Sequence, residues 1–238
     1  MRGAGSVLRP CAMIPWRLLA RAEVPGAEAG GELRLFERGG ELVIRAGAHV
    51  LMSSRASASE EALGTLAAAR LEGRRAPRVL VAGLGMGFTL AAALRGLAPR
   101  AEVDVAELVP AVVEWNRGVL GPLAGHPLRD PRVSVREADV AAVLREAPSA
   151  WDSVLLDVDN GPQAIARRRN AGLYGARGLA EAHEALRPGG FLATWSASAE
   201  PHYPKRLRAA GFRVEEARVP SRRSGRGARR VVWIATRG

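Results

Sequence analysis

The chain has 238 residues, 47% of them hydrophobic, which is enough for one large α/β domain with a small appendage. It has a single cysteine, Cys11, which excludes a disulfide framework within the chain, and no apolar run approaches the roughly 20 residues of a membrane span. We therefore expect a cytoplasmic protein with no membrane partner. The formal net charge of +11 comes almost entirely from arginine, since Lys205 is the only lysine. Because the arginines are scattered and few aromatic residues lie among them, we expect no nucleic-acid partner.

The N-terminal third of the chain predicts a lead followed by a small β-rich domain. Residues 1–30 carry no sustained pattern, and we interpret them as a partly disordered lead. Apolar and polar residues then alternate in short runs over 31–55, which predicts a small antiparallel sheet. Ser57 and Glu60 have the spacing of a helix capping box, so a linking helix should follow. We take 31–76 as the small domain and its linking helix.

From residue 77 the chain alternates strand and helix patterns to its C-terminus. We predict seven strands, at 79–82, 103–107, 133–136, 153–157, 191–195, 212–218 and 231–236. We predict helices between them at 87–97, 110–117, 140–146, 173–186 and 201–210. Repeated strand–helix units imply an α/β domain over 77–238 with a mostly parallel, doubly wound sheet. The last two strands are joined by a non-helical loop and should form an antiparallel hairpin.

The turn after the first strand of this domain carries the most informative motif. An apolar run ends at Ala82, and glycines follow at alternate positions, Gly83, Gly85 and Gly87, before an alanine-rich helix. Glycines in such a turn let the backbone pass close to a ligand. A dinucleotide-binding fingerprint would need one more glycine where this chain has Phe88.

Two carboxylates end later strand patterns. Glu107 closes the second strand, where it can accept hydrogen bonds from two ribose hydroxyls. Together with the glycine turn, this acid favours a nucleoside-bearing cofactor without a pyrophosphate, which means an S-adenosyl compound. Asp157 closes the buried run 153–157 at the carboxyl end of a strand, and open α/β sheets bind ligands at that edge.

These motifs, from about Leu33 to the C-terminus, resemble the spermidine synthase-like polyamine aminopropyltransferases. The resemblance is carried, in the family's order, by residues 83–87, 106–110, 137–139, 151–162, 173–174 and 186–190. It implies the class I S-adenosylmethionine-dependent methyltransferase fold, a doubly wound seven-stranded sheet whose last strand is reversed, with a small N-terminal β-rich domain. The family often forms dimers, so the resemblance leaves a homodimer open.

The resemblance also implies a donor site. Its cofactor-binding residues would be Gly83, Gly85, Gly87, Glu107, Ala138 and Asp139. Glu107 would hold the ribose, and Asp139 would accept a hydrogen bond from the adenine amine, although Asp139 is also placed to cap the helix at 140–146. The donor would be decarboxylated S-adenosylmethionine or S-adenosylmethionine itself. No metal is expected, because the histidines and the cysteine lack metal-ligand spacing.

On the acceptor side, Asp157 matches the family's catalytic aspartate. A carboxylate there can attract an ammonium group, take or relay its proton, and direct the amine lone pair at the electrophilic carbon. The family's turn normally carries an aspartate where this chain has Met86, and its Tyr-His-Glu motif is replaced by Ser-Glu-Glu at positions 59–61. The acceptor-site candidates of this chain are Glu60, Glu61, Asp159 and Tyr174, of which the three acids would form an anionic pocket for a cationic substrate.

We therefore predict a spermidine synthase-like transferase of polyamine biosynthesis, which moves an aminopropyl group from decarboxylated S-adenosylmethionine to a small-molecule amine acceptor. Two alternatives stay open: an S-adenosylmethionine-dependent methyltransferase, and a noncatalytic homologue that keeps only the nucleoside pocket. A third alternative, nucleic-acid modification, rests on the arginine excess alone.

Overall fold

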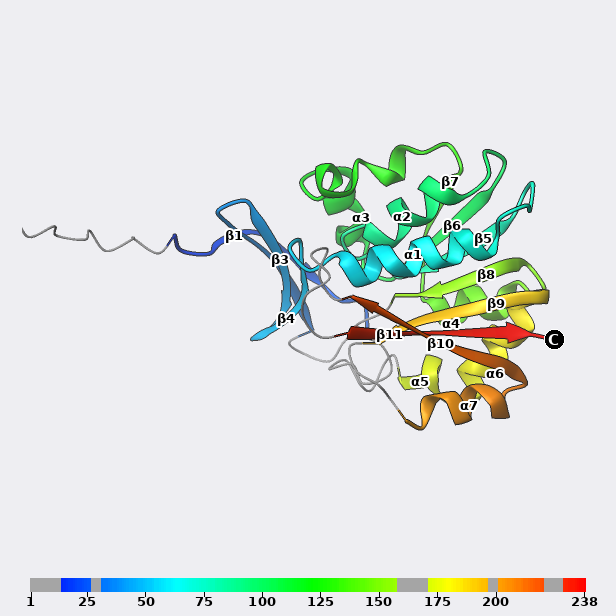
Figure 1. Cartoon of the computed structure of the whole chain (residues 1–238). Coiled ribbons are helices and arrows are strands. Elements are labelled where there is room, and N and C mark those ends of the chain that lie inside the picture. Colours follow the sequence, from blue (N-terminus) through cyan, green and yellow to red (C-terminus); the bar gives the residue numbers. More distant parts are fainter. Residues whose placement is uncertain (1–13, 27–30, 158–170, 197–200, 221–228) are drawn as a thin grey trace, which may run out of the picture.

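A computed structural model describes residues 14–26, 31–157, 171–196, 201–220 and 229–238 (Figure 1). The described strands form a four-stranded antiparallel N-terminal sheet and a seven-stranded main sheet. The N-terminal sheet has the order β1-β2-β3-β4, formed by β1 (Arg17–Glu23), β2 (Glu32–Arg38), β3 (Glu41–Ala46) and β4 (His49–Ser53). None of the described helices is long and apolar enough to cross a membrane.

The main sheet has the order β10-β11-β9-β8-β5-β6-β7. Its strands are β5 (Arg78–Ala82), β6 (Glu102–Glu107), β7 (Val133–Glu137), β8 (Trp151–Leu156), β9 (Leu186–Ser196), β10 (Phe212–Pro220) and β11 (Arg229–Arg237). Neighbouring strands among β7, β6, β5, β8 and β9 pair in parallel. Strand β11 runs antiparallel to both of its neighbours, β9 and β10. The predicted α/β fold, with its reversed last strand and separate N-terminal β sheet, is therefore confirmed.

Helices cover both faces of the main sheet (Figure 1). They are α1 (Ala58–Arg70), α2 (Phe88–Gly96), α3 (Pro110–Arg117), α4 (Val140–Glu146), α5 (Ala171–Tyr174), α6 (Ala176–Ala185) and α7 (Tyr203–Ala209), with 3₁₀ turns η1 (Gly121–Ala124) and η2 (Pro127–Arg129). In β5, Val79 and Val81 belong to one core cluster, and Leu80 and Ala82 belong to the other. Because alternate side chains of a strand point to opposite faces, a strand covered on both sides is apolar throughout.

Three local features differ from the sequence prediction. Residues 17–23, expected within a partly disordered lead, form strand β1, which pairs with β2. The register shifts between Leu18 and Ala20, and this irregularity hides the alternation by which a strand is recognised. The capping box is not formed, since the Ser57 hydroxyl donates to the Glu61 carboxylate at 2.8 Å. The single helix predicted over 173–186 is two helices, separated at Gly175.

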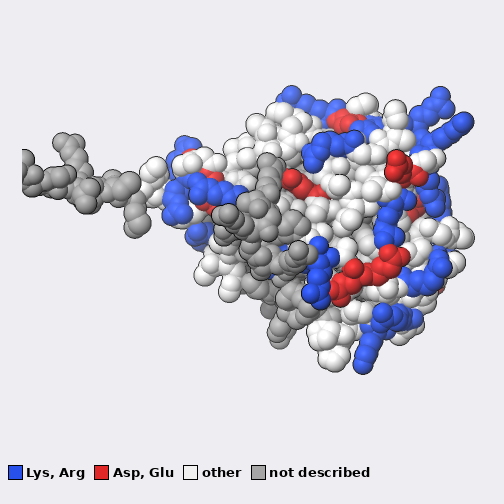
Figure 2. All heavy atoms as spheres, in the orientation of Figure 1, with Lys and Arg blue, Asp and Glu red and all other residues white. Residues whose placement is uncertain are grey.

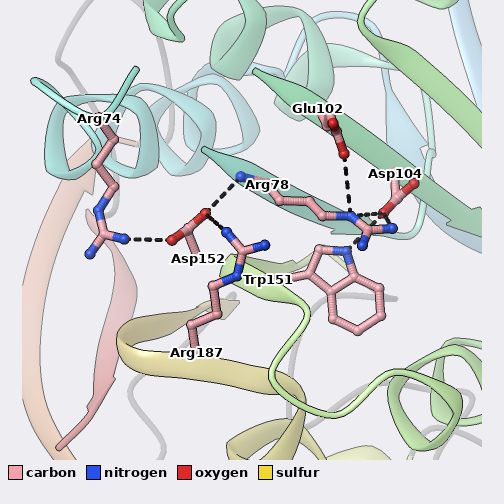
Figure 3. A network of polar contacts seen from close by, with 7 residues as sticks. All are labelled: Arg74, Arg78, Glu102, Asp104, Trp151, Asp152 and Arg187. Carbon is pink, nitrogen blue, oxygen red and sulfur yellow. Dashed lines mark hydrogen bonds and ion pairs between the residues drawn. The ribbon is translucent and has the colours of Figure 1, made fainter. Parts of the chain in front are cut away.

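A buried carboxylate fastens the amino-terminal edge of the main sheet (Figure 3). Asp152 of β8 is 3% exposed and accepts hydrogen bonds from the backbone N–H of Arg78 at 2.8 Å and from the guanidinium of Arg187 at 2.9 Å. The Arg74 guanidinium also pairs with it. This carboxylate therefore joins the segment after α1 to the first residues of β5, β8 and β9, on the opposite edge from the glycine turn.

Helix α1 packs unusually close to α2, at small residues. A Cβ built on Gly64 would lie 2.3 Å from the Thr89 carbonyl oxygen, and one built on Gly96 would lie 2.8 Å from the Ala68 Cβ. Only glycine fits at these contacts. The close approach brings the first turn of α1 to the first turn of α2, directly beside the end of β8.

Candidate functional site

Three neighbouring strands of the main sheet end at the same level. Ala82 at the end of β5 is paired in register with Ala106 of β6 and Leu156 of β8. The Asp157 backbone N–H donates to the Ala82 carbonyl at 3.0 Å, which extends this alignment by one residue. Glu107 and Asp157 therefore flank the turn after β5, with their backbones about 10 Å apart, two strand spacings. The strand register thus puts both acids beside the turn, as the sequence predicted.

The turn itself requires its glycines. Gly83, Gly85 and Gly87 have φ values of +89°, +53° and +80°, in the left-handed region that side chains rarely adopt. A Cβ on Gly85 would lie 2.8 Å from the Met52 Sδ atom, and one on Gly87 would lie 2.9 Å from the Asn116 Oδ1 atom. The turn is therefore closely packed, with Met52 of β4 against one side and Asn116 of α3 against the other, and of its three glycines Gly83 alone is partly exposed.

Asn116 of α3 supports the turn, and the sequence reasoning did not find this role. Its side-chain amide donates to the carbonyl oxygens of Gly85 at 2.8 Å and Val112 at 2.9 Å, and the residue is 1% exposed. Within the described part of the chain its Oδ1 atom has no hydrogen-bond partner. The available signal was a lone amide on the otherwise apolar buried face of α3.

The Glu107 carboxylate is held rigidly beside the turn. Its Oε2 atom accepts from the Leu84 backbone N–H and its Oε1 atom from the Val109 backbone N–H, each at 2.9 Å, and only 9% of the residue is exposed. A carboxylate oxygen can accept more than one hydrogen bond, and hydroxyl groups are among the donors that suit it. This geometry suits the predicted ribose contact, which stays a prediction.

The two residues predicted at the adenine follow β7, at the same edge. The Ala138 backbone N–H donates to the Glu107 carbonyl at 3.0 Å, so the two strand ends are tied together. Asp139 is exposed, and its Oδ1 atom accepts from the Ala141 backbone N–H at 2.7 Å. Asp139 therefore caps α4, as the sequence allowed. Its contact with adenine stays a prediction.

An acidic cluster, made of Glu60, Glu61 and Asp157, forms on the β8 side of the turn. The Thr89 hydroxyl lies 2.6 Å from the Asp157 Oδ2 atom and 3.0 Å from the Glu60 carbonyl oxygen, so it links α1 and α2 to the end of β8. Burial raises the pKa of the Glu60 carboxyl well above its usual value, and the negative charges of Asp157 and Glu61 raise it further. The structure thus brings together acids that are far apart in the sequence.

The other acceptor-side residues have different surroundings. Met86 is 1% exposed and packs in the core, so an apolar contact replaces the aspartate of the resembled family. Tyr174 is 2% exposed and packs edge-on against Tyr203, with ring centroids 5.9 Å apart, and its contact with a substrate stays a prediction. Asp159 lies outside the described residues.

Charge on the rest of the molecule is mixed. On the face seen in Figure 2, basic side chains lie in separate groups with acidic groups between them. Many arginines have a nearby acidic partner, such as the exposed pair of Arg136 and Glu146, whose nitrogen and oxygen lie 2.7 Å apart. No cluster of histidine, cysteine and acidic side chains that could hold a metal is found among the described residues.

No family model and no curated protein matches the sequence. Among solved structures, a spermidine synthase in complex with the transition-state analogue AdoDATO has a TM-score of 0.68 at 17% identity, over 93% of this chain and 73% of that one. Spermidine synthase from Thermotoga maritima has a TM-score of 0.69 at 16% identity, with the same two coverages. A precorrin-6y C5,15-methyltransferase from Geobacter metallireducens GS-15 has a TM-score of 0.52 at 16% identity, over 73% of this chain and 86% of that one. The chain therefore has the spermidine synthase-like form of the class I methyltransferase fold.

Proposed function

We propose that the protein is a transferase that moves an aminopropyl group from decarboxylated S-adenosylmethionine to a small amine. The observation that carries this proposal is the acidic cluster beside the glycine turn, on the opposite side from Glu107. One side of the turn suits a nucleoside, and the other suits cations. The reaction needs both sides, because its donor is a nucleoside sulfonium with an ammonium group and its acceptor is an amine.

The donor fits the turn by its chemistry. The turn presents the partly exposed backbone of Gly83 with no side chain, and the fixed Glu107 carboxylate beside it is a suitable acceptor for a vicinal diol. A donor without a carboxylate brings only positive charge toward Asp157 and Glu60. The ionised carboxylates of the cluster attract such a donor and repel one that carries a carboxylate.

The acceptor step needs a base more than an acid. An amine is protonated at neutral pH and cannot attack until it loses a proton, and in the proposed reaction that proton goes to the Asp157 carboxylate. The amine nitrogen then forms a bond to the carbon beside the sulfonium, the carbon–sulfur bond breaks, and a neutral thioether leaves. Asp157 acts by orienting the amine and holding its proton, and no group has to protonate the leaving sulfur.

A methyltransferase is the second candidate, and one observation favours it. Gly87 begins α2 without a side-chain cap, so the backbone N–H groups of that helix end, which carry partial positive charge, can receive a carboxylate. Intact S-adenosylmethionine has such a carboxylate. The two candidate functions therefore differ in the donor: the site would prefer decarboxylated S-adenosylmethionine in an aminopropyltransferase and intact S-adenosylmethionine in a methyltransferase.

The test is turnover with the full-length protein. Decarboxylated S-adenosylmethionine is supplied with a panel of mono- and diamines, and products are identified by mass spectrometry. We expect transfer of an aminopropyl group to at least one amine, and a loss of about a hundredfold or more in kcat for Asp157→Asn, which keeps the shape but removes the base. Methyl transfer from intact S-adenosylmethionine under the same conditions would replace the proposal, and nucleoside binding with no turnover would support a noncatalytic homologue.

A further inference from the structure

We propose that Thr89 is a positioning residue that satisfies Asp157 in both of its protonation states, an inference that rests on the proposed role of Asp157 as the proton acceptor. The Thr89 side-chain oxygen lies 2.6 Å from Asp157 Oδ2 and 3.0 Å from the Glu60 carbonyl oxygen. A hydroxyl group has one hydrogen to donate and can also accept. With two possible acceptors nearby, it donates to only one of them at a time.

The choice of acceptor follows the proton on Asp157. When the carboxylate is ionised, the Thr89 hydroxyl donates to Oδ2. When Asp157 has taken the proton of an ammonium group and carries it on Oδ2, that O–H donates to the Thr89 oxygen. The Thr89 hydrogen then rotates to the Glu60 carbonyl oxygen. Each state has a hydrogen bond between the two side chains. Asp157 gains the proton that the ammonium group loses, Thr89 keeps its own hydrogen throughout, and the carboxyl group keeps its position through the reaction.

The surroundings keep this hydroxyl in place. Thr89 is 1% exposed, so water does not readily replace its bonds. The close packing of α1 on α2 at Gly64 holds the Glu60 carbonyl at hydrogen-bond distance, since the Thr89 backbone itself forms that contact. The two hydrogen bonds of Thr89, to Asp157 and to the Glu60 carbonyl, set the direction of its side-chain oxygen.

Among the described residues, two helices bring charge or partial charge toward Asp157. Helix α1 brings Glu60, which in turn lies near Glu61, and α2 brings the partly positive end of its backbone together with Thr89. Residues 158–170 follow Asp157 and lie outside the described residues. A hydrogen bond donated to the ionised form of a carboxyl group favours that form, so the Thr89 hydroxyl bears on which state of Asp157 is populated.

The test is a titration of the Asp157 carboxyl that needs no substrate. Carboxyl carbons are labelled with ¹³C and followed by NMR across pH in the full-length protein, with Asp157→Asn used to assign the signal. A hydrogen bond to an ionised group is about twice as strong as one between neutral groups, so its removal in Thr89→Val should move the midpoint up by about one pH unit. Thr89→Ser keeps the hydroxyl and should restore the midpoint to within about 0.3 units.

An unchanged midpoint in Thr89→Val would overturn the proposal, whatever the protein catalyses. If Thr89→Val does not fold, as judged by circular dichroism, Thr89→Ala is titrated in its place with the same expectation. A raised midpoint in a protein with no transferase activity would support the Thr89–Asp157 coupling and reject the proposed function instead. In an active protein, the acid limb of the kcat profile should move with the same midpoint in Thr89→Val, while the KM for the donor stays within about twofold.

Discussion

Replacement of Gly64 by alanine tests how the acidic cluster is assembled. In Gly64→Ala the new Cβ would lie 2.3 Å from the Thr89 carbonyl oxygen, 2.7 Å from the Ala93 backbone nitrogen and 2.8 Å from the Ala92 Cβ. Two of these atoms belong to the backbone of α2, so side-chain rotation cannot relieve the contact. Helix α1 has to move away by about 1 Å to reach ordinary van der Waals distance.

The substitution makes two contributions to stability, and they have opposite signs. Overpacking of this kind costs about 1–3 kcal/mol, whereas alanine in place of glycine within a helix returns about 1 kcal/mol. The backbone contacts place the cost at the upper end, so the net loss is about 2 kcal/mol. In a domain of this size that lowers the Tm by about 4–8 °C. The same displacement separates the Glu60 carbonyl from the Thr89 hydroxyl and should lower kcat more than it weakens binding of the donor.

Thermal unfolding by calorimetry measures the first effect, and Gly172→Ala is the matched control. Gly172 is also helical, in α5, but nothing lies within 4 Å of a Cβ built there, so its Tm should stay equal or rise slightly. A Tm of Gly64→Ala equal to that of the unmodified protein or of this control would refute the close-packing argument.

Three further changes give separable outcomes. Asp152→Ala removes the carboxylate that binds the Arg78 N–H and two guanidinium groups, and chemical denaturation should show a loss of about 3 kcal/mol in the free energy of unfolding. Its control is Glu102→Gln, at an exposed ion pair of 3.7 Å, which should change that free energy by less than about 0.5 kcal/mol. The pKa of Glu60 is higher in the folded state than in the unfolded chain, so folding favours its protonated form. The free energy of unfolding should therefore fall as pH rises from about 4.5, and Glu60→Gln should flatten this slope; a parallel curve would contradict the raised pKa. Glu107→Gln should weaken binding of 5′-methylthioadenosine at least tenfold by calorimetry, and unchanged affinity would remove the acid from the nucleoside site.

The sequence predicted the main sheet because central strands such as β5 are apolar on both faces and the turn after β5 is marked by glycine. Val79 to Ala82 followed by the glycine turn locates β5 and α2, and acids at the ends of the later strands locate the same edge. Register then brings Glu107 and Asp157 beside the turn, as expected for neighbouring parallel strands. Strand β1 was not predicted, because its irregularity at Leu18 breaks the period of two.

The supporting residues of the site were not predicted, since they depend on tertiary contacts. Thr89 lies in a helix pattern that gives no sign of a partner at the end of β8, and Asn116 lies on a helix face that looks like core. The role of Gly64 depends on the distance between two helices that no local pattern encodes. Glu60 and Glu61 were singled out through a resemblance, and the structure explains why they lie near Asp157.

Binding of the donor tests the account most directly. Isothermal titration of the full-length protein with decarboxylated S-adenosylmethionine, and separately with S-adenosylmethionine, measures the preference of the site formed by the glycine turn, Glu107 and the acidic cluster. We expect tighter binding of the decarboxylated compound by about tenfold or more, because the intact donor places its carboxylate among acids. Equal or tighter binding of the intact donor would contradict the aminopropyl assignment, and no binding of either compound would contradict the nucleoside site itself.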